Sequence, residues 1–280
     1  MTEQQSASNE LWRGVDLSGI TLVLGIGTGQ LVELLAEEAQ RAGGTVVLTS
    51  YSRAALSAHF DRVGPLPIER LCCRARELPL ADSSVDLCVV NGSLREVPPA
   101  HYRAFLEELW RVLVPGGAVR ISDLLPPSDA LYGRAWRQRC DLITHLGEAL
   151  GVPVALYADV RALAEAMQAV GFESMAVSLL PGYGLTDDWL SETVEAVTTM
   201  LSRVADPETR RTLRDVELPA LIAAYRLGDQ RAAERFVTRG NKIGDLALDM
   251  ETAGTEQELA PRDDDDDHHH GGGALGEPRP

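Results

Sequence analysis

A short apolar stretch that runs directly into a glycine-rich turn constrains the fold of this chain more than any other segment. Residues 21–24 (TLVL) lead into GIGTG at 25–29, after which apolar residues recur at helical spacing. A short apolar run bounded by glycines predicts a buried strand, and the periodicity after it predicts a helix. Glycines let a ligand approach the backbone, and a helix N-terminus attracts anionic groups. The segment is therefore either a ligand-holding strand–loop–helix unit or a plain tight turn.

Strand and helix patterns continue to alternate along the chain after this unit. The expected strands cover 21–25, 45–49, 68–73, 85–90 and 118–124, with helices expected at 29–42, 53–63 and 99–113. This alternation predicts an α/β fold with a doubly wound, Rossmann-like, mainly parallel sheet. Ligands bind such sheets at the carboxyl ends of the strands, beside the point where the strand order reverses. Residues 25–29 would lie at that point.

The character of the sequence changes along the chain, and we divide it accordingly. Residues 1–10 are polar and expected to be disordered, and 11–182 form the Rossmann-like domain. Residues 183–253 are charged and helical, as in a helical cap or extension, with room for a final strand at 242–250. The tail at 254–280 carries DDDDDHHHGGG, and like charges in a run repel one another. We expect this tail to be disordered and acidic; weak binding of a transition metal is the alternative.

Composition excludes several classes of function. The formal net charge of -16 argues against a general binder of nucleic acid or of an anionic membrane, both of which require a basic surface. Four cysteines at 72, 73, 88 and 140 lack the spacing of a metal site, so we expect reduced thiols and no metal. No apolar run of about 18 residues and no signal peptide is found, so we expect a cytoplasmic protein. The oligomeric state is left open.

Four stretches together resemble class I S-adenosylmethionine-dependent methyltransferases, in particular the methyltransferase 11 or UbiE-like type. They are LVLGIGTGQLVELLA at 22–36, ARELPLADSSVDLCVVNGSLREVP at 75–98, FLEELWRVLVPGGAVRISD at 105–123 and AMQAVGFESMAVSLL at 166–180. The second and third stretches are the more specific. The glycine loop also differs from the G-x-G-x-x-G of dinucleotide-binding proteins, because Gln30 takes the place of the last glycine.

The resemblance implies S-adenosylmethionine as cofactor and in-line methyl transfer to a small-molecule acceptor, whose methylated atom could be carbon, oxygen, nitrogen or arsenic. The resemblance also implies which residues would contact the cofactor. They are Gly25, Ile26, Gly27, Thr28, Gly29, Ser50, Tyr51, Arg76, Glu77, Leu78 and Asn91. The loop would hold the methionine end, Ser50 and Tyr51 would lie by the ribose, and 76–78 by the adenine. Asn91 would face the transferred methyl group, unless it only caps its loop.

Three acids that such relatives usually carry in the cofactor site are replaced in this chain. Val23 precedes the glycine loop, Ser50 ends the second strand, and Arg74 follows the third, where we expect it to point to solvent. Two other functions therefore stay open. One is a catalytically degenerate methyltransferase-like binding or partner protein. The other is an NADP-dependent oxidoreductase, since Ser50, Ser52 and Arg53 could suit a 2′-phosphate.

Three residues are candidates for a catalytic acid or base in this interpretation. Asp123 ends the strand at 118–124, on the edge where the ligand is expected, and Glu96 follows the strand at 85–90. His145 lies in the region that would roof the pocket, although a lone histidine on such a helix is often packed or at the surface. Tyr157 is a further candidate base, and the sequence leaves the base unassigned among these residues.

Gly27→Val tests the placement of the ligand in the glycine loop. A branched side chain there should block the close approach of a ligand without unfolding the protein. Isothermal titration with S-adenosylhomocysteine, together with a melting curve, measures both effects. Unaltered affinity in the folded variant would contradict the placement.

Overall fold

The computed structural model describes residues 11–25, 30–60, 66, 68–126, 133–152, 154–182, 184–227 and 231–244. The described residues up to Gly244 belong to one compact unit. The predictions for the N-terminus at 1–10, for loop residues 26–29 and for the tail at 254–280 lie outside the described residues.

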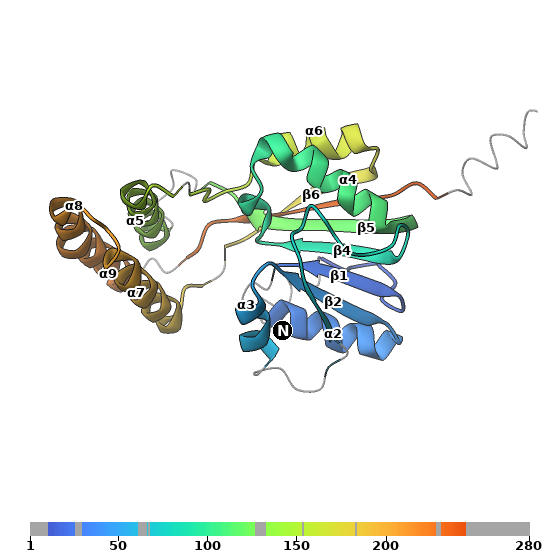
Figure 1. Cartoon of the computed structure of the whole chain (residues 1–280), viewed down its shortest axis with the longest axis horizontal. Coiled ribbons are helices and arrows are strands. Elements are labelled where there is room, and N and C mark those ends of the chain that lie inside the picture. The colour runs from blue at the N-terminus through green and yellow to red at the C-terminus, as the bar shows by residue number, and fades with distance from the viewer. Residues whose placement is uncertain are drawn as a thin grey trace, which may run out of the picture. The chain divides into compact units, whose positions relative to one another are not determined.

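In the described part of the chain, seven strands form one sheet in the order β3-β2-β1-β4-β5-β7-β6 (Figure 1). The first five strands pair in parallel, whereas β7 is antiparallel to both of its neighbours. This arrangement confirms the predicted doubly wound, mainly parallel sheet. The strands are β1 Ile20–Leu24, β2 Thr45–Ser50, β3 Ile68–Cys72, β4 Val85–Asn91, β5 Leu113–Leu124, β6 Glu173–Leu180 and β7 Arg235–Asn241.

The last strand enters the sheet between two strands that precede it in the sequence. β7 begins at Arg235, ahead of the start expected at residue 242, and ends at Asn241. It pairs with β5 over its whole length and with β6 on its other side. The segment Arg235–Asn241 therefore belongs to the sheet and does not continue the helical extension, because antiparallel pairing with β5 satisfies its backbone hydrogen bonds.

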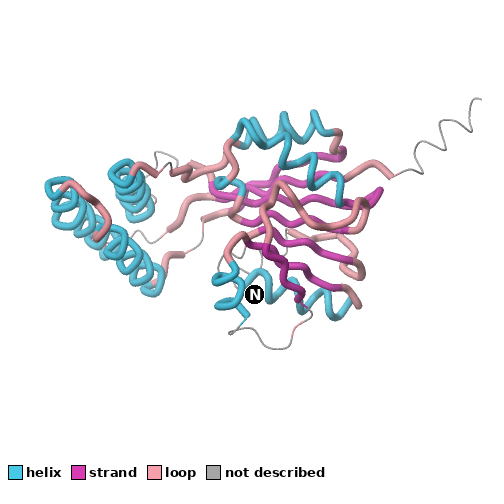
Figure 2. The backbone as a smooth tube through the Cα atoms, in the orientation of Figure 1, coloured by secondary structure: helices cyan, strands magenta, loops and turns pink. Residues whose placement is uncertain are grey.

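Helices cover both faces of the sheet (Figures 1 and 2). On one face, α2 and α3 pack with the chain around Trp12 against the side chains of β1, β2 and β4. On the other face, α4 and α6 pack over β1, β4 and β5. These elements are α2 Gln30–Ala42, α3 Arg53–Phe60, α4 Tyr102–Val112 and α6 Val160–Val170, with short 3-10 turns at Leu94–Glu96 and Pro99–His101 before α4.

The remaining helices share a separate apolar cluster, which we call the helical cap. Its helices are α5 Arg134–Leu150, α7 Asp187–Leu201, α8 Pro207–Thr212 and α9 Leu218–Arg226, with a π-helical segment at Leu213–Glu217. Rings of Trp136, Trp189 and Tyr225 stack with successive centroid separations of 6.1 Å. Leu124, at the end of β5, is buried in the same cluster. The cap is thus joined by packing to the carboxyl end of β5.

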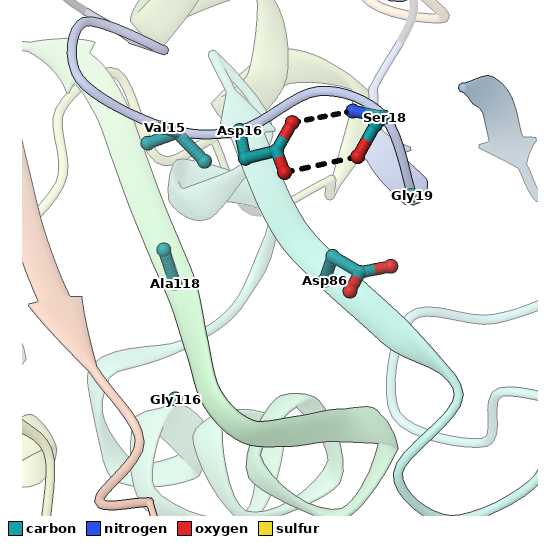
Figure 3. A pocket seen from close by; sticks show the side chains of 7 residues that line it. All are labelled: Val15, Asp16, Ser18, Gly19, Asp86, Gly116 and Ala118. Carbon is teal, nitrogen blue, oxygen red and sulfur yellow. Dashed lines mark hydrogen bonds between the residues drawn. The ribbon is translucent and has the colours of Figure 1, made fainter. Parts of the chain in front are cut away.

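The opposite, amino edge of the sheet is held by two carboxylates around a shallow pocket (Figure 3). Asp86 on β4 accepts a 2.7 Å hydrogen bond from the Ile20 backbone, and Asp16 accepts from the backbone and hydroxyl of Ser18. A Cβ on Gly19 would lie 2.0 Å from the Asp86 carboxylate, so only glycine fits there. Both acids therefore fix the entry of the chain into β1.

Two glycines after α2 offer a matched test of how this entry is packed. Their backbone N–H groups donate to the carbonyls of Gln40 and Ala39, which is the Schellman pattern of a helix end. Gly43 has φ of +87° with open space beside it, whereas a Cβ on Gly44 would lie 1.9 Å from the Leu17 carbonyl oxygen. Gly43→Ala should cost about 1–2 kcal/mol through its backbone conformation.

Gly44→Ala should cost about 3 kcal/mol or more, because the chain around Leu17 must move. Urea unfolding followed by circular dichroism measures both free energies. Equal losses for the two variants would show that the contact with Leu17 does not constrain this turn.

Candidate functional site

The carboxyl ends of the five parallel strands meet along one edge of the sheet, and the strand order reverses between β1 and β4. Four residues singled out from the sequence stand at this edge, because each ends or directly follows its strand. They are Gly25 after β1, Ser50 on β2, Asn91 on β4 and Asp123 near the end of β5. The fold therefore places them along the edge at which such sheets bind ligands.

Gly25 sits in a conformation and a space that favour glycine. Its φ is +95°, and a Cβ there would lie 3.0 Å from both the Asn91 carbonyl oxygen and the Ser93 side chain. The Ser93 hydroxyl donates to the Leu24 carbonyl at 3.0 Å, which ties the end of β1 to the turn after β4. Helix α2 begins at Gln30. Ile26, Gly27, Thr28 and Gly29 lie outside the described residues.

The ends of β2 and β3 carry a serine and an arginine at positions where related sites are expected to carry acids. The half-buried Ser50 accepts a 3.1 Å hydrogen bond from the Ser52 backbone through its hydroxyl oxygen. Tyr51 is 76% exposed, so its ring is open to solvent. Arg74 is also exposed, as expected from the sequence. Val23 is fully buried in the core and contributes no polar group.

The loop after β3 is held from α4. Glu108 accepts a 2.7 Å hydrogen bond from the Leu78 backbone, and Arg111 donates to the carbonyls of Leu78 and Leu80 at 3.0 and 2.9 Å. Hydrogen bonding to Arg111 holds the pKa of Glu108 below its usual range. Leu78 is buried, whereas Arg76 and Glu77 are exposed. The two anchoring residues lie 30 and 33 positions from Leu78, so local sequence patterns do not reveal them.

A polar group that the sequence did not suggest joins three strands at the carboxyl edge. Arg235, the first residue of β7, donates from Nη2 to Asn91 Oδ1 and to Ser122 Oγ, both at 2.8 Å. Asn91 and Ser122 are paired in the β4–β5 register. Ser122 is fully buried, while Asn91 and Arg235 are half-buried. Arg235 is 144 positions from Asn91, and only the insertion of β7 beside β5 brings them together.

Asp123 is buried and used to hold the turn that follows β4. Its two carboxylate oxygens accept from the backbone N–H groups of Arg95 and Leu124 at 3.1 and 2.8 Å. The Arg95 guanidinium lies 3.6 Å from the same carboxylate. The pKa of Glu96 is raised, chiefly because burial removes part of its hydration. The charge of Asp123 also raises this pKa, whereas the charge of Arg95 lowers it. Glu96 nevertheless stays in contact with solvent.

His145 lies on α5 and is paired within the helical cap. Its Nδ1 is 3.0 Å from both carboxylate oxygens of Glu217, and its side chain is 52% exposed. Hydrogen bonding to Glu217 raises the pKa of His145. Nearby, the Cys140 Sγ and Tyr157 Oη atoms are 2.9 Å apart, and burial raises the pKa of both groups. These contacts connect α5 to the π-helical segment of the cap and to the loop before α6.

The described residues offer neither a metal site nor a membrane-spanning helix. They contain no group of three or more histidine, cysteine, aspartate or glutamate side chains arranged to hold a metal ion. Among the helices that the structure describes, none has the length and apolar character needed to cross a membrane.

Comparison with known proteins gives this edge of the sheet a family context. Residues 22–121 match the family model described as a methyltransferase domain. Demethylmenaquinone methyltransferase of Corynebacterium glutamicum (strain R) is 27% identical over 124 residues, covering 44% of this chain and 50% of that protein. The chain thus spans about half the length of this relative.

Two solved structures share the fold. A Bacillus halodurans C-125 protein assigned as a methyltransferase has a TM-score of 0.55 at 13% identity, with 86% of this chain and 100% of that chain covered. Haemonchus contortus phosphoethanolamine N-methyltransferase 2, solved with S-adenosyl-L-methionine, has a TM-score of 0.50 at 16% identity. The match covers 86% of this chain and 52% of that chain. At these identities, both comparisons concern the fold alone.

The pair of His145 and Glu217 predicts a pH-dependent stability. Because the pKa of His145 is raised in the folded protein, the pair stabilises the fold fully below the unfolded pKa of about 6.5. That stabilisation is lost as the pH rises through the higher, folded pKa. His145→Gln should therefore lower the melting temperature at about pH 5.5 and change it little at about pH 9.

His101→Gln serves as the control, because His101 is exposed and lies in the turn before α4. Its melting temperature should follow the wild type at both pH values. If His145→Gln lowered the melting temperature by the same amount at both pH values, the charge on His145 would not contribute to stability.

Proposed function

Because residues 22–121 carry a methyltransferase domain within a sheet of class I methyltransferase topology, we propose that this chain is an S-adenosylmethionine-dependent methyltransferase. We further propose that it acts on a small-molecule acceptor by in-line transfer. The observation that carries the proposal is that the segment matching the methyltransferase domain includes the strand ends along the expected ligand-binding edge. The matched segment ends at Ile121 and contains the strand ends that bear Gly25, Ser50 and Asn91 along the ligand-binding edge.

The chain's own groups suit the cofactor at this edge. The left-handed backbone of Gly25 turns the chain at the end of β1, and the half-buried Ser50 and Asn91 offer a hydroxyl and an amide at the same edge. We propose that residues 25–29 hold the methionine end, that Ser50 and Tyr51 lie by the ribose, and that Arg76, Glu77 and Leu78 lie by the adenine. Bound S-adenosylmethionine would supply a methyl group on an already activated sulfonium.

The missing acids predict a weaker hold on the ribose than a carboxylate would give. A hydrogen bond to a charged group contributes roughly 1.5–3 kcal/mol, which corresponds to about tenfold to a hundredfold in affinity. Ser50 can replace part of this, since a hydroxyl has one donor and two acceptor positions and only one acceptor position is used by Ser52. We propose that the exposed Arg74 points to solvent, so that its charge does not oppose binding.

Among the three candidate catalytic groups, Glu96 is the best suited to accept a proton. A base works best when its pKa lies close to the working pH, and the pKa of Glu96 is raised toward that range. Asp123 has both oxygens engaged by backbone donors, so we propose that it positions the turn carrying Glu96. For His145 we propose a supporting role, because its ring is paired with Glu217 in the cap.

The acceptor is proposed to be a small molecule with an apolar part. The helical cap brings Trp136, Trp189 and the half-buried Tyr157 into one apolar cluster with Leu124, at the end of β5. Aromatic side chains of this kind provide apolar contact area. The net charge of -16 does not favour a nucleic acid as acceptor.

A non-catalytic role is the second candidate, and the ends of β2 and β3 favour it. This region presents Ser50, the exposed Tyr51 and Arg74 where a nucleoside would be held by acids in a typical relative. Such a protein would keep the fold and serve as a binding or partner subunit. It should bind S-adenosylhomocysteine weakly or not at all.

Titration of the full chain with S-adenosylhomocysteine and, separately, with NADP⁺ tests these alternatives. We expect heat and a rise in melting temperature with S-adenosylhomocysteine alone, at micromolar to submillimolar affinity. A response to NADP⁺ alone would indicate an oxidoreductase. Absence of any response to millimolar ligand would contradict the proposed methyltransferase and favour the non-catalytic protein.

A further inference from the structure

The contact between Arg235 and Asn91 determines which way the Asn91 amide faces. An arginine nitrogen can only donate a hydrogen bond, so the atom that it contacts must be the amide oxygen. Arg235 Nη2 lies 2.8 Å from that oxygen and also 2.8 Å from Ser122 Oγ. The second contact fixes the guanidinium as well. The Asn91 NH2 group is therefore turned away from Arg235.

The position of Asn91 makes this orientation relevant to a ligand. Asn91 is the last residue of β4, and its carbonyl oxygen would lie 3.0 Å from a Cβ on Gly25. It thus stands where β1 and β4 end side by side, at the reversal of the strand order. Its half-buried side chain remains partly open to solvent. A ligand in this place would meet the amide as a hydrogen-bond donor.

The charges around Asn91 bear on the kind of group that it would meet. The cationic guanidinium of Arg235 contacts the amide oxygen and polarises the amide, which strengthens its N–H groups as donors. Asp123 on β5 follows Ser122, the register partner of Asn91, and its carboxylate oxygens are already engaged with Arg95 and Leu124. Charge-assisted hydrogen bonds are the stronger ones, so an anionic oxygen gains most from such a donor.

We propose that Arg235 is a positioning residue that holds the Asn91 amide as a donor toward an anionic oxygen of the ligand. The identity of that ligand rests on the proposed function. The oxygen could belong to the α-carboxylate of the cofactor or to a carboxylate or similar oxyanion of the methyl acceptor. In either case, the site selects a ligand with an oxyanion next to Asn91.

The Asn91→Asp substitution removes the NH2 donor of residue 91 while it keeps an oxygen in contact with Arg235. The carboxylate keeps, and strengthens, the interaction with Arg235, but it replaces the NH2 group by a second acceptor oxygen. Two matched ligand pairs serve as probes in calorimetric titrations. S-adenosylhomocysteine and 5′-methylthioadenosine differ by the amino-acid part with its carboxylate, and benzoate and benzamide differ by the charge of one group.

The variant should lower the affinity for the carboxylate member of one pair by about tenfold to a hundredfold, while the other member changes by less than about threefold. A selective loss of S-adenosylhomocysteine assigns the oxygen to the cofactor, and a selective loss of benzoate assigns it to the acceptor. The proposal would be overturned if the variant kept the wild-type preference for the carboxylate ligand in both pairs. It would also be overturned if the wild-type protein preferred neither S-adenosylhomocysteine nor benzoate over its matched partner.

Variants of Arg235 test the positioning role itself. Arg235→Met removes the donor that orients the amide and should reduce the same carboxylate preference, and Arg235→Lys should restore part of it. Arg239→Met is the matched control, because Arg239 is an exposed residue of the same strand. Loss of melting temperature in Arg235→Met without any change in ligand preference would show a purely structural role and overturn the proposal.

The outcomes for the two proposals can be told apart. If wild-type protein does not bind S-adenosylhomocysteine, the proposed methyltransferase is contradicted, and the benzoate pair alone decides whether Asn91 receives an oxyanion. If S-adenosylhomocysteine binds but Asn91→Asp alters neither preference, the methyltransferase stands and the role of Arg235 is overturned.

Discussion

The pairing of β1 with β4 is the constraint on which the candidate site depends. These strands run parallel in a register that aligns Leu24 with Val90. The register places Gly25 beside Asn91 and lets Ser93 reach back to the Leu24 carbonyl. A slip of one residue would turn every side chain of β1 to the other face of the sheet. The burial of Leu22, Val23 and Leu24 against two different cores prevents such a slip.

Around this pair of strands, the edge of the sheet uses neutral groups where stronger electrostatic contacts would be expected. Ser50 presents a hydroxyl, Asn91 an amide, and Asp123 is already satisfied by backbone donors. Arg235 on β7 brings a cation to this edge, where it contacts Asn91 and Ser122. Binding would thus rely on neutral groups, one of which, the Asn91 amide, is oriented by an arginine that is distant in the sequence.

Much of the fold could be predicted from the sequence because its signals are local. The apolar runs before the glycine loop and before Asn91 predicted buried strands, and both are strands in the structure. Gly43 and Gly44 predicted the end of a helix, and the helix ends at Ala42. β7 was placed too late, since its position depends on antiparallel pairing with β5, which no local pattern specifies.

The site was less accessible to sequence reasoning for the same physical reason. Ser50 and Asn91 could be named because each ends a strand. The roles of Arg235 and of Glu108 could not, because their partners lie far away in the chain. The pairing of His145 with Glu217, 72 positions apart, was likewise hidden until the cap helices were placed. A partial signal existed for β7 in the β-favouring residues Phe236, Val237 and Thr238.

A crystal structure of the full chain with bound S-adenosylhomocysteine would locate the ligand on the sheet. We expect the ligand at the carboxyl ends of β1, β2 and β4, with the ribose hydroxyls within hydrogen-bond distance of Ser50 and with Arg74 facing solvent. Ligand density at any other edge of the sheet, or a guanidinium of Arg74 filling the nucleoside position, would contradict this expectation.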